Sequence, residues 1–166
     1  MNKQIKKNQG FSLFEMVVVI SVVGILAAAA IPNYFNVKDG AKEAIILNTL
    51  QSVVTANSSV FGEALLEGKD DGRKKLDDIS LWNGNIVMRA PNLRHALKTN
   101  LEILDFKLFN LPINEDKSIQ HGLYVVHGED YQTYKESGVI PQCFVRAVQR
   151  KNEGGKPIID SNTNMC

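Results

Sequence analysis

Residues 11–31 read FSLFEMVVVISVVGILAAAAI, and Glu15 is the only charged side chain among them. A helix of these 21 residues extends about 32 Å, which is enough to cross the hydrocarbon core of a bilayer. Twelve of them are Phe, Leu, Ile or Val, and each favours insertion by about 0.3–0.6 kcal/mol. Because one acidic group near the end of a span costs about 3 kcal/mol or less, the sequence predicts a membrane-spanning helix.

The charges on either side of this segment predict its orientation. Lys3, Lys6 and Lys7 precede the segment, and Asp39 follows it. Because positively charged flanks stay in the cytoplasm, we expect the rest of the chain to be extracytoplasmic. The alternative is a cleavable secretory signal, with the small residues Ala27–Ala30 near its cleavage site. Glu15 argues against that alternative, because a carboxylate in an apolar segment is costly and usually has a function.

The length and composition of the chain predict one globular domain plus this segment. The chain has 166 residues, of which 44% are hydrophobic and 22% charged. A net charge of +1 argues against a dedicated nucleic-acid-binding protein.

The residues around the start of the apolar segment resemble the processing site of type IV prepilins. Gly10 is followed by Phe11 and, four residues later, by Glu15. The resemblance implies cleavage between Gly10 and Phe11, N-methylation of Phe11 and a role for Glu15 in assembly. Ser12 and Phe14 depart mildly from the family pattern Phe-Thr-Leu-Ile-Glu.

This resemblance implies a structural function. We expect a subunit that waits in the inner membrane and then forms a helical homo-oligomeric filament on the cell surface, for attachment and biofilm formation. Its expected partners are a prepilin peptidase/methyltransferase and the pilus assembly machinery. We hypothesise that Glu15 and the amine of Phe11 set subunit register in the filament; the alternative is neutralisation within one helix.

Beyond the span, apolar residues at steps of three and four predict that the helix continues to about Leu66. Pro32 and Gly40 could bend or locally melt it. The charged stretch 67–75 should be an exposed loop. The predicted parts are a leader (1–10), a helix (11–66) and a head (67–166). The residues expected to carry the apolar face are Ala41, Ile45 or Ile46, Leu50, Val53, Val54, Val60, Phe61, Ala64 and Leu65.

The head should be a small antiparallel sheet packed on this helix, which makes the fold class α+β. The strands are expected to bury one face each. Residues 152–155 should form a turn before 157–159, and Phe106, Leu108 and Phe109 should add to the core or to a strand. The predicted elements are a short strand at 84–89, a helix at 92–104 that Pro91 starts, and strands at 122–126 and 143–148.

Cys143 and Cys166 are the two cysteines, and we expect a disulfide between them because disulfides persist in exported proteins; two unpaired thiols are the alternative. The pair resembles the C-terminal disulfide that bounds a variable surface loop in many pilins. Residues between the cysteines are then candidates for contact with other subunits or a host, with an ordinary solvated surface as the alternative. These residues are Arg146, Arg150, Lys151, Lys156 and Asp160.

Further residues resemble pilins of the mannose-sensitive haemagglutinin type. They are Ile31–Phe35, Asp39–Glu43, Ala56–Asn57, a proline ahead of a short helix and a final cysteine. Where those pilins often have Gly-Tyr-Pro, this chain has Arg89-Ala90-Pro91.

The sequence has no pattern that predicts catalysis, a cofactor or a metal site. His95, His121 and His127 lack the spacing of zinc ligands and should be surface or partly buried residues. Neither Asp70–Asp71 nor Glu129–Asp130 has the alternating oxygen ligands of a calcium loop. We therefore expect a protein that is not an enzyme.

Two other functions stay open. One is a pseudopilin of a type II secretion system, and the other is a secreted binding protein without its signal. A glycan receptor is a possible partner, although Trp82 and Tyr124 are expected in the core or in an interface rather than at a sugar site.

Overall fold

The computed structural model describes residues 12–97, 99–105, 117–164 and 166, apart from the side chains of residues 32, 33 and 36. The chain divides into two compact units, residues 1–38 and 39–166. Helix α1 (Leu13–Leu66) contributes to both. It ends at Leu66, as predicted, and the backbone is helical through Pro32 and Gly40, so neither residue melts it locally.

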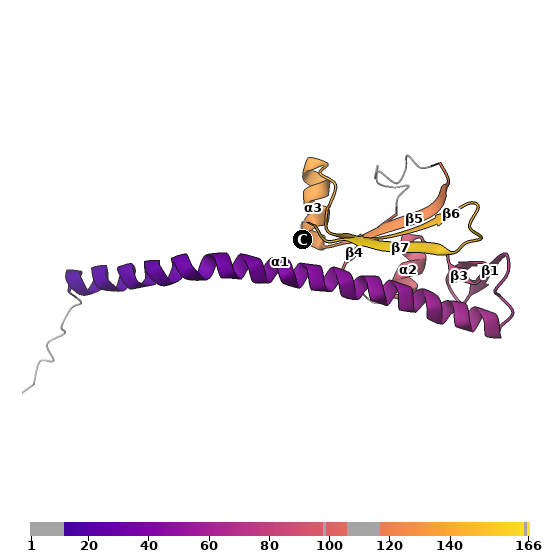
Figure 1. The fold of residues 1–166 in the computed structure, drawn as a ribbon, viewed down its shortest axis with the longest axis horizontal. Helices are drawn as coiled ribbons and strands as arrows, with labels where there is room; N and C mark the ends of the chain where they lie inside the picture. The colour runs from indigo at the N-terminus through magenta and orange to yellow at the C-terminus, as the bar shows by residue number, and fades with distance from the viewer. Residues whose placement is uncertain (1–11, 98, 106–116, 165) are drawn as a thin grey trace, which may run out of the picture. The chain divides into compact units, whose positions relative to one another are not determined.

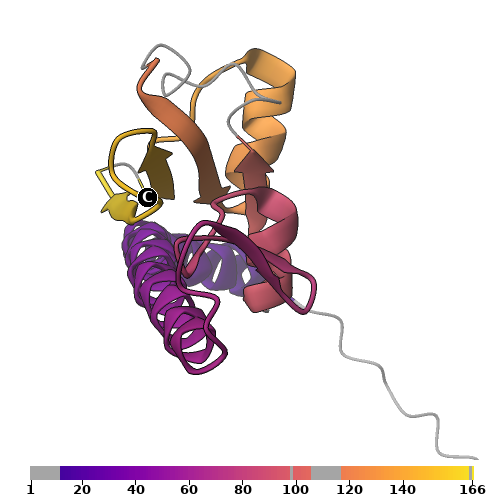
Figure 2. The same cartoon turned by 90° about the vertical axis from the view of Figure 1, so that its right-hand side faces the viewer.

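The second unit contains two antiparallel sheets, and the α+β fold class is confirmed. Figure 1 shows the larger sheet along the part of α1 that belongs to this unit, with the smaller sheet near the end of α1. The smaller sheet has the order β1 (Arg73–Leu76), β2 (Ile79–Trp82), β3 (Asn85–Ile86). The larger sheet has the order β4 (Glu102–Asp105), β5 (Ile119–Val126), β6 (Phe144–Arg150), β7 (Pro157–Asn162). The other helices are α2 (Ala90–Ala96) and α3 (Gly128–Ser137), both visible in Figure 2.

Strand β5 has side chains in two different cores. Leu123 and Val125 pack in the cluster that includes the buried face of α1. Tyr124 and Val126 pack in a second cluster, which includes residues of α3. Successive side chains of a strand point to opposite faces of its sheet, so both faces of β5 are covered. The expectation of one buried face is therefore wrong for this strand.

The residues of α1 that pack on the head are spaced three or four positions apart, as in an amphipathic helix. Apolar neighbours of this face, such as Ala41, Val54 and Leu65, are exposed although the sequence pattern included them. Two polar residues that the pattern left out are buried instead. The buried face consists of Ile46, Thr49, Val53, Asn57, Val60 and Ala64.

Buried amides join α1, β3 and β6. The Asn57 carbonyl accepts a hydrogen bond from the Ile86 amide at 3.0 Å, and its amide donates to Asn85 at 3.0 Å. Gln149 accepts from the Met88 amide at 2.9 Å and donates to the Ile86 carbonyl at 2.9 Å. These bonds satisfy backbone groups of β3 and of the segment after it, which would otherwise be buried without partners.

Three predicted elements need correction. The stretch 67–75 is not loop throughout, because Arg73–Leu76 forms β1. The strand expected at 84–89 is limited to Asn85–Ile86. The helix expected at 92–104 is α2, which starts with a proline in its first turn as predicted but ends at Ala96. Residues 102–105 pair with β5 instead, because β4 completes the edge of the larger sheet. Phe106, Leu108 and Phe109 lie outside the described residues.

The remaining strand predictions are confirmed. The predicted strands at 122–126 and 143–148 correspond to β5 and β6, and 157–159 lies in β7. The predicted turn at 152–155 connects β6 to β7. Helix α3 was not predicted, because none of its residues is fully buried and it has no clear apolar stripe.

Candidate functional site

The first unit presents an apolar helical surface. Residues Leu13–Ile31 are helical, have a mean hydropathy of 2.5, and none of them is buried within the structure. By length and composition this helix can cross a membrane. Leu13 and Phe14, for example, are 83% and 76% exposed. A helix that is apolar on all sides requires lipid or other apolar helices around it.

Glu15 lies in the first turn of α1, where its negative charge is favourable beside the unpaired amides of a helix N-terminus. The helix begins at Leu13, and the Met16 amide donates to the Ser12 carbonyl at 3.2 Å. The carboxylate is exposed. Gly10 and Phe11, the residues of the predicted cleavage site, lie outside the described residues. The proposed pairing of the Phe11 amine with Glu15 therefore stays a prediction.

Cys143 and Cys166 form a disulfide in the structure, with 4.9 Å between their Cα atoms. Cys143 is 1% exposed and belongs to the main core, against which Cys166 packs. The residues between them form the β6–β7 hairpin, whose ladder runs from Phe144 with Asn162 to Gln149 with Pro157. The segment is thus a paired hairpin, and the disulfide anchors the few residues that follow β7.

The charged residues of this hairpin do not all offer free charges to a partner. Arg146 and Asp160 lie opposite each other on β6 and β7, and the Arg146 Nε donates to Asp160 Oδ1 at 2.9 Å. This hydrogen bond raises the pKa of Arg146. Burial raises the pKa of Tyr124, and Arg146 opposes that change. Lys151 and Lys156 are exposed.

Helix α3 contacts the part of α1 at the start of the second unit through an ion pair with Lys42. The Lys42 ammonium lies 3.0 Å from a Glu129 oxygen and 3.8 Å from an Asp130 oxygen. Burial disfavours the ammonium, but the hydrogen bond to Glu129 and the nearby carboxylates outweigh it and raise the pKa of Lys42. His127 lies within 3.3 Å of the Lys42 carbonyl oxygen. The sequence indicated no partner for Lys42, because the pairing depends on a helix that lacks an apolar pattern.

The ion pair with Lys42 leaves little reason to place calcium at Glu129–Asp130, because a cation already occupies that position. Within the described ranges, no group of three or more His, Cys, Asp or Glu side chains is arranged to hold a metal ion. His95 is exposed, but His121 and His127 are buried, with 4% and 9% of their surface exposed. The expectation of surface or partly buried histidines is therefore wrong for these two. Tyr124 is in the core, 5% exposed, with Phe144 beside its ring, while Trp82 is partly buried.

Residues 5–31 match the family model of the prokaryotic N-terminal methylation motif. The match includes the predicted cleavage site, Glu15 and the apolar helix.

Two relatives are similar to part of this chain. A type IV major pilin protein, PilA, of Myxococcus xanthus is 39% identical over 57 residues, which are 34% of this chain and 26% of the relative. A fimbrial protein of Pseudomonas aeruginosa is 35% identical over 65 residues, which are 39% of this chain and 40% of the relative. The aligned residues thus span less than half the length of these relatives. No solved structure matches the chain.

Proposed function

We propose that this chain, which is related to type IV pilins over about a third of its length and carries their N-terminal methylation motif, is a structural subunit of a type IV pilus. One observation carries the proposal. A 19-residue apolar helix, none of which is buried within the chain, has a single carboxylate in its first turn and lies in the segment that matches the methylation motif. Such a surface is suited to lipid before assembly and to the helices of other subunits afterwards.

The processing step follows from the position of Gly10. Cleavage after Gly10 removes the basic leader and leaves the apolar helix attached to the head, with a new α-amine at Phe11. In the sequence after this cleavage site, Lys38 is the first basic side chain. The Phe11 amine is therefore the one cation in the apolar part of the mature helix, and Glu15 is its one anion.

These two charges set the register of neighbouring subunits. In a bundle of apolar helices, an unpaired carboxylate is costly, and breaking a buried pair costs about 3–5 kcal/mol. An incoming subunit whose amine meets the Glu15 carboxylate of a neighbour satisfies both charges. A subunit displaced along the axis leaves both unpaired. Van der Waals packing alone would not distinguish these positions as strongly, because lipid is as apolar as the helix surface.

The subunit is oriented with its N-terminus in the cytoplasm and its head outside, in the inner membrane before assembly and in a surface filament afterwards. The filament serves attachment and biofilm formation. The mannose-sensitive haemagglutinin subtype is supported by the Ile31–Phe35 and Asp39–Glu43 stretches and by the final cysteine. The disulfide supports a filament subunit over a pseudopilin, because calcium more often stabilises the corresponding region of major pseudopilins.

The test is Glu15→Val, with Glu63→Val as the matched control. Glu63 is also an exposed glutamate of α1, but it lies outside the apolar segment. Glu15→Val should accumulate as processed, unassembled subunits in the membrane, while Glu63→Val should form filaments like the unmodified chain. Normal filament yield from Glu15→Val would contradict the role of Glu15.

Mass spectrometry of purified surface filaments tests processing independently. A chain that begins at methylated Phe11 is expected. A chain that begins near Ile31 would instead identify a secreted protein that has lost its signal. In cells that lack the chain, a secretion defect without a loss of surface filaments would identify a pseudopilin.

A further inference from the structure

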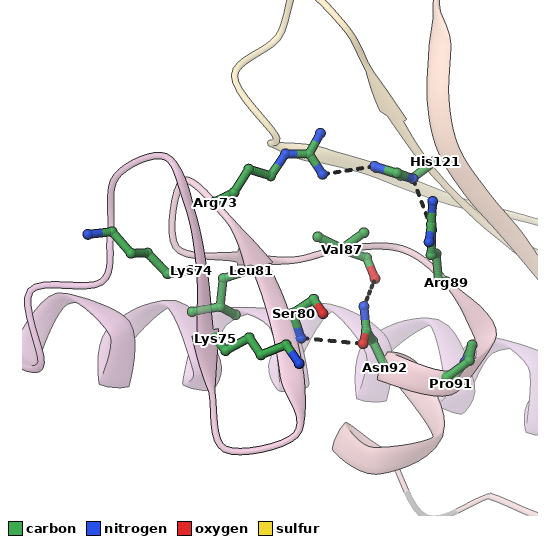
Figure 3. A pocket seen from close by; sticks show the side chains of 10 residues that line it. All are labelled: Arg73, Lys74, Lys75, Ser80, Leu81, Val87, Arg89, Pro91, Asn92 and His121. Atoms are coloured by element: carbon green, nitrogen blue, oxygen red, sulfur yellow. Dashed lines mark hydrogen bonds between the residues drawn. The ribbon is translucent and has the colours of Figure 1, made fainter.

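A pocket of the head brings together basic side chains of β1, an arginine just before α2 and a histidine of β5. It has a volume of about 620 Å³ and lies between the β1–β2 hairpin, the start of α2 and the beginning of β5. Figure 3 shows the residues around it. We call it the cationic pocket, and its lining consists of Arg73, Lys74, Lys75, Ser80, Leu81, Val87, Arg89, Pro91, Asn92 and His121.

The lining contains four basic side chains and no acidic one. Lys74 has an ion pair with Asp71 at 3.5 Å. For Arg73, Lys75 and Arg89, the described part of the chain provides no carboxylate within ion-pair distance. The other arginines of the head differ in this respect. Arg94, Arg146 and Arg150 pair with Glu102, Asp160 and Glu153, respectively.

The two arginines of the pocket converge on one buried imidazole. Arg73 Nη1 lies 3.1 Å from His121 Nε2, and Arg89 Nε lies 3.3 Å from His121 Nδ1. A neutral imidazole has one acceptor nitrogen, so it accepts a hydrogen bond from one guanidinium at a time. Each guanidinium has five N–H donors, and these contacts use few of them. The geometry thus holds two guanidinium groups close together with an excess of donors, which suits an oxyanion.

The other walls of the pocket restrict the kind of oxyanion. Leu81, Val87 and Pro91 provide apolar surface beside the basic groups. Asn92 is occupied, because it accepts from the Ser80 amide at 3.3 Å and donates to the Val87 carbonyl at 2.8 Å. A ligand with one acidic group and a compact, partly apolar body fits this combination, as a sugar ring with its C–H faces does.

Nucleic acid fits less well. Proteins bind single strands by stacking bases on aromatic rings along a basic groove. Trp82 is next to the pocket, but the Arg73 guanidinium lies over one face of its ring, 4.5 Å from the ring centroid, where a base would have to stack. The Trp82 ring also packs nearly perpendicular to the His121 ring, with 6.1 Å between the ring centroids.

We propose that the cationic pocket binds the carboxylate or sulfate group of an acidic sugar, with Arg73 and Arg89 as its main donors and Lys74 and Lys75 at its rim. The proposal concerns the head alone, and it holds whether or not the apolar helix assembles a filament. A head that binds an acidic sugar would attach the cell surface on which the head is displayed to acidic polysaccharide.

The experiment measures binding by the full-length chain in an uncharged detergent, using titration calorimetry. The probes are a glucuronate-containing tetrasaccharide, a sulfated heparin disaccharide, a neutral chitobiose, sodium sulfate and a short single-stranded DNA. The variants are Arg89→Gln and Lys75→Gln, with Lys151→Gln as the matched control. Lys75 and Lys151 are both exposed lysines, but Lys151 lies outside the pocket.

At least one of the acidic sugars should bind at concentrations up to about 1 mM. Arg89→Gln should weaken this binding about tenfold or more, because it removes a charge-assisted hydrogen bond. Lys75→Gln should weaken it less, Lys151→Gln should leave it unchanged, and added salt should weaken it for the unmodified chain. The tryptophan emission of each variant should match that of the unmodified chain, which shows that the head is folded.

Five results would overturn the proposal. The acidic sugars fail to bind; Arg89→Gln binds them like the unmodified chain; chitobiose binds equally well; sodium sulfate binds as tightly as the sugars do; or the DNA binds more tightly with the same dependence on Arg89. A failure of filament assembly in Glu15→Val would leave this proposal unaffected, so the two proposals fail separately.

Discussion

Replacing Val53 by alanine should destabilise the head substantially. Val53 is 0% exposed and lies in the middle of the face of α1 that packs on the sheet. The substitution removes two methyl groups, which at about 0.8 kcal/mol per buried carbon amounts to about 1.6 kcal/mol before any cavity is counted. The higher helix propensity of alanine returns about 0.5 kcal/mol, and the cavity adds a similar amount. The expected net loss in the free energy of unfolding is about 1.5–2 kcal/mol.

Val54 provides a control in the same helix. It is the next residue along the chain, it is 40% exposed, and Val54→Ala makes the same chemical change. Its free energy of unfolding should stay within about 0.5 kcal/mol of that of the unmodified chain.

Urea unfolding in an uncharged detergent measures both variants, with the emission of the single tryptophan, Trp82, as the signal. For a unit of this size, a loss of 1.5–2 kcal/mol corresponds to a decrease in Tm of about 6–7 °C. An equal loss in both variants would refute the assignment of the buried face, because it would mean that the helix packs in another rotation.

Three further predictions concern the head. Gly155→Ala should lower the free energy of unfolding by about 2 kcal/mol or more, because φ is +84° and a Cβ would lie 2.5 Å from a carbonyl oxygen of β2. Gly62→Ala, with open space around the position, should be neutral or slightly stabilising in the same urea unfolding assay; a larger loss for Gly62→Ala than for Gly155→Ala would contradict the hairpin geometry. The double variant Cys143→Ser, Cys166→Ser should lose about 3 kcal/mol in urea unfolding by the loop-entropy model, and unchanged stability would argue against the crosslink. Lys42→Met should be less stable than the unmodified chain by an amount that is constant between about pH 7 and 9 and shrinks above about pH 10.4. The reason is that a raised pKa of Lys42 in the folded state stabilises the fold at pH values below the unfolded-state pKa, and this contribution is lost as the pH rises through the folded-state pKa. A stability difference that grows above about pH 10.4 would contradict this prediction.

The sequence was sufficient for elements whose pattern is local. The end of α1 at Leu66 was predicted because a charged, glycine-containing stretch follows it. Strands β5 and β6 were predicted because β-branched residues are concentrated in them. The start of α2 was predicted from Pro91, since proline suits the first turn of a helix.

The sequence was misleading where a local pattern competed with a distant partner. Leu93, Leu97, Leu101 and Leu104 have helical spacing, yet Leu104 pairs with Tyr124 in the larger sheet. The gain from completing the edge of the sheet outweighed the helical periodicity. Strand β1 carries three consecutive basic residues, and this composition predicts a loop. The ladder with β2 that makes it a strand cannot be seen in the composition of β1 itself.

Of the candidate sites, one could be recognised in the sequence, and the others are formed only by tertiary packing. The apolar helix, Glu15 and the residues of the expected cleavage site are neighbours in the chain, so the sequence by itself determined that they belong to one functional segment. The cationic pocket joins Arg73, Arg89 and His121, which are far apart in the sequence and come together when β1, the start of α2 and β5 pack. The ion pair of Lys42 with Glu129 arises likewise from the docking of α3. Periodicity and composition act over neighbouring residues, whereas the distance between charges on separate elements is decided by tertiary packing.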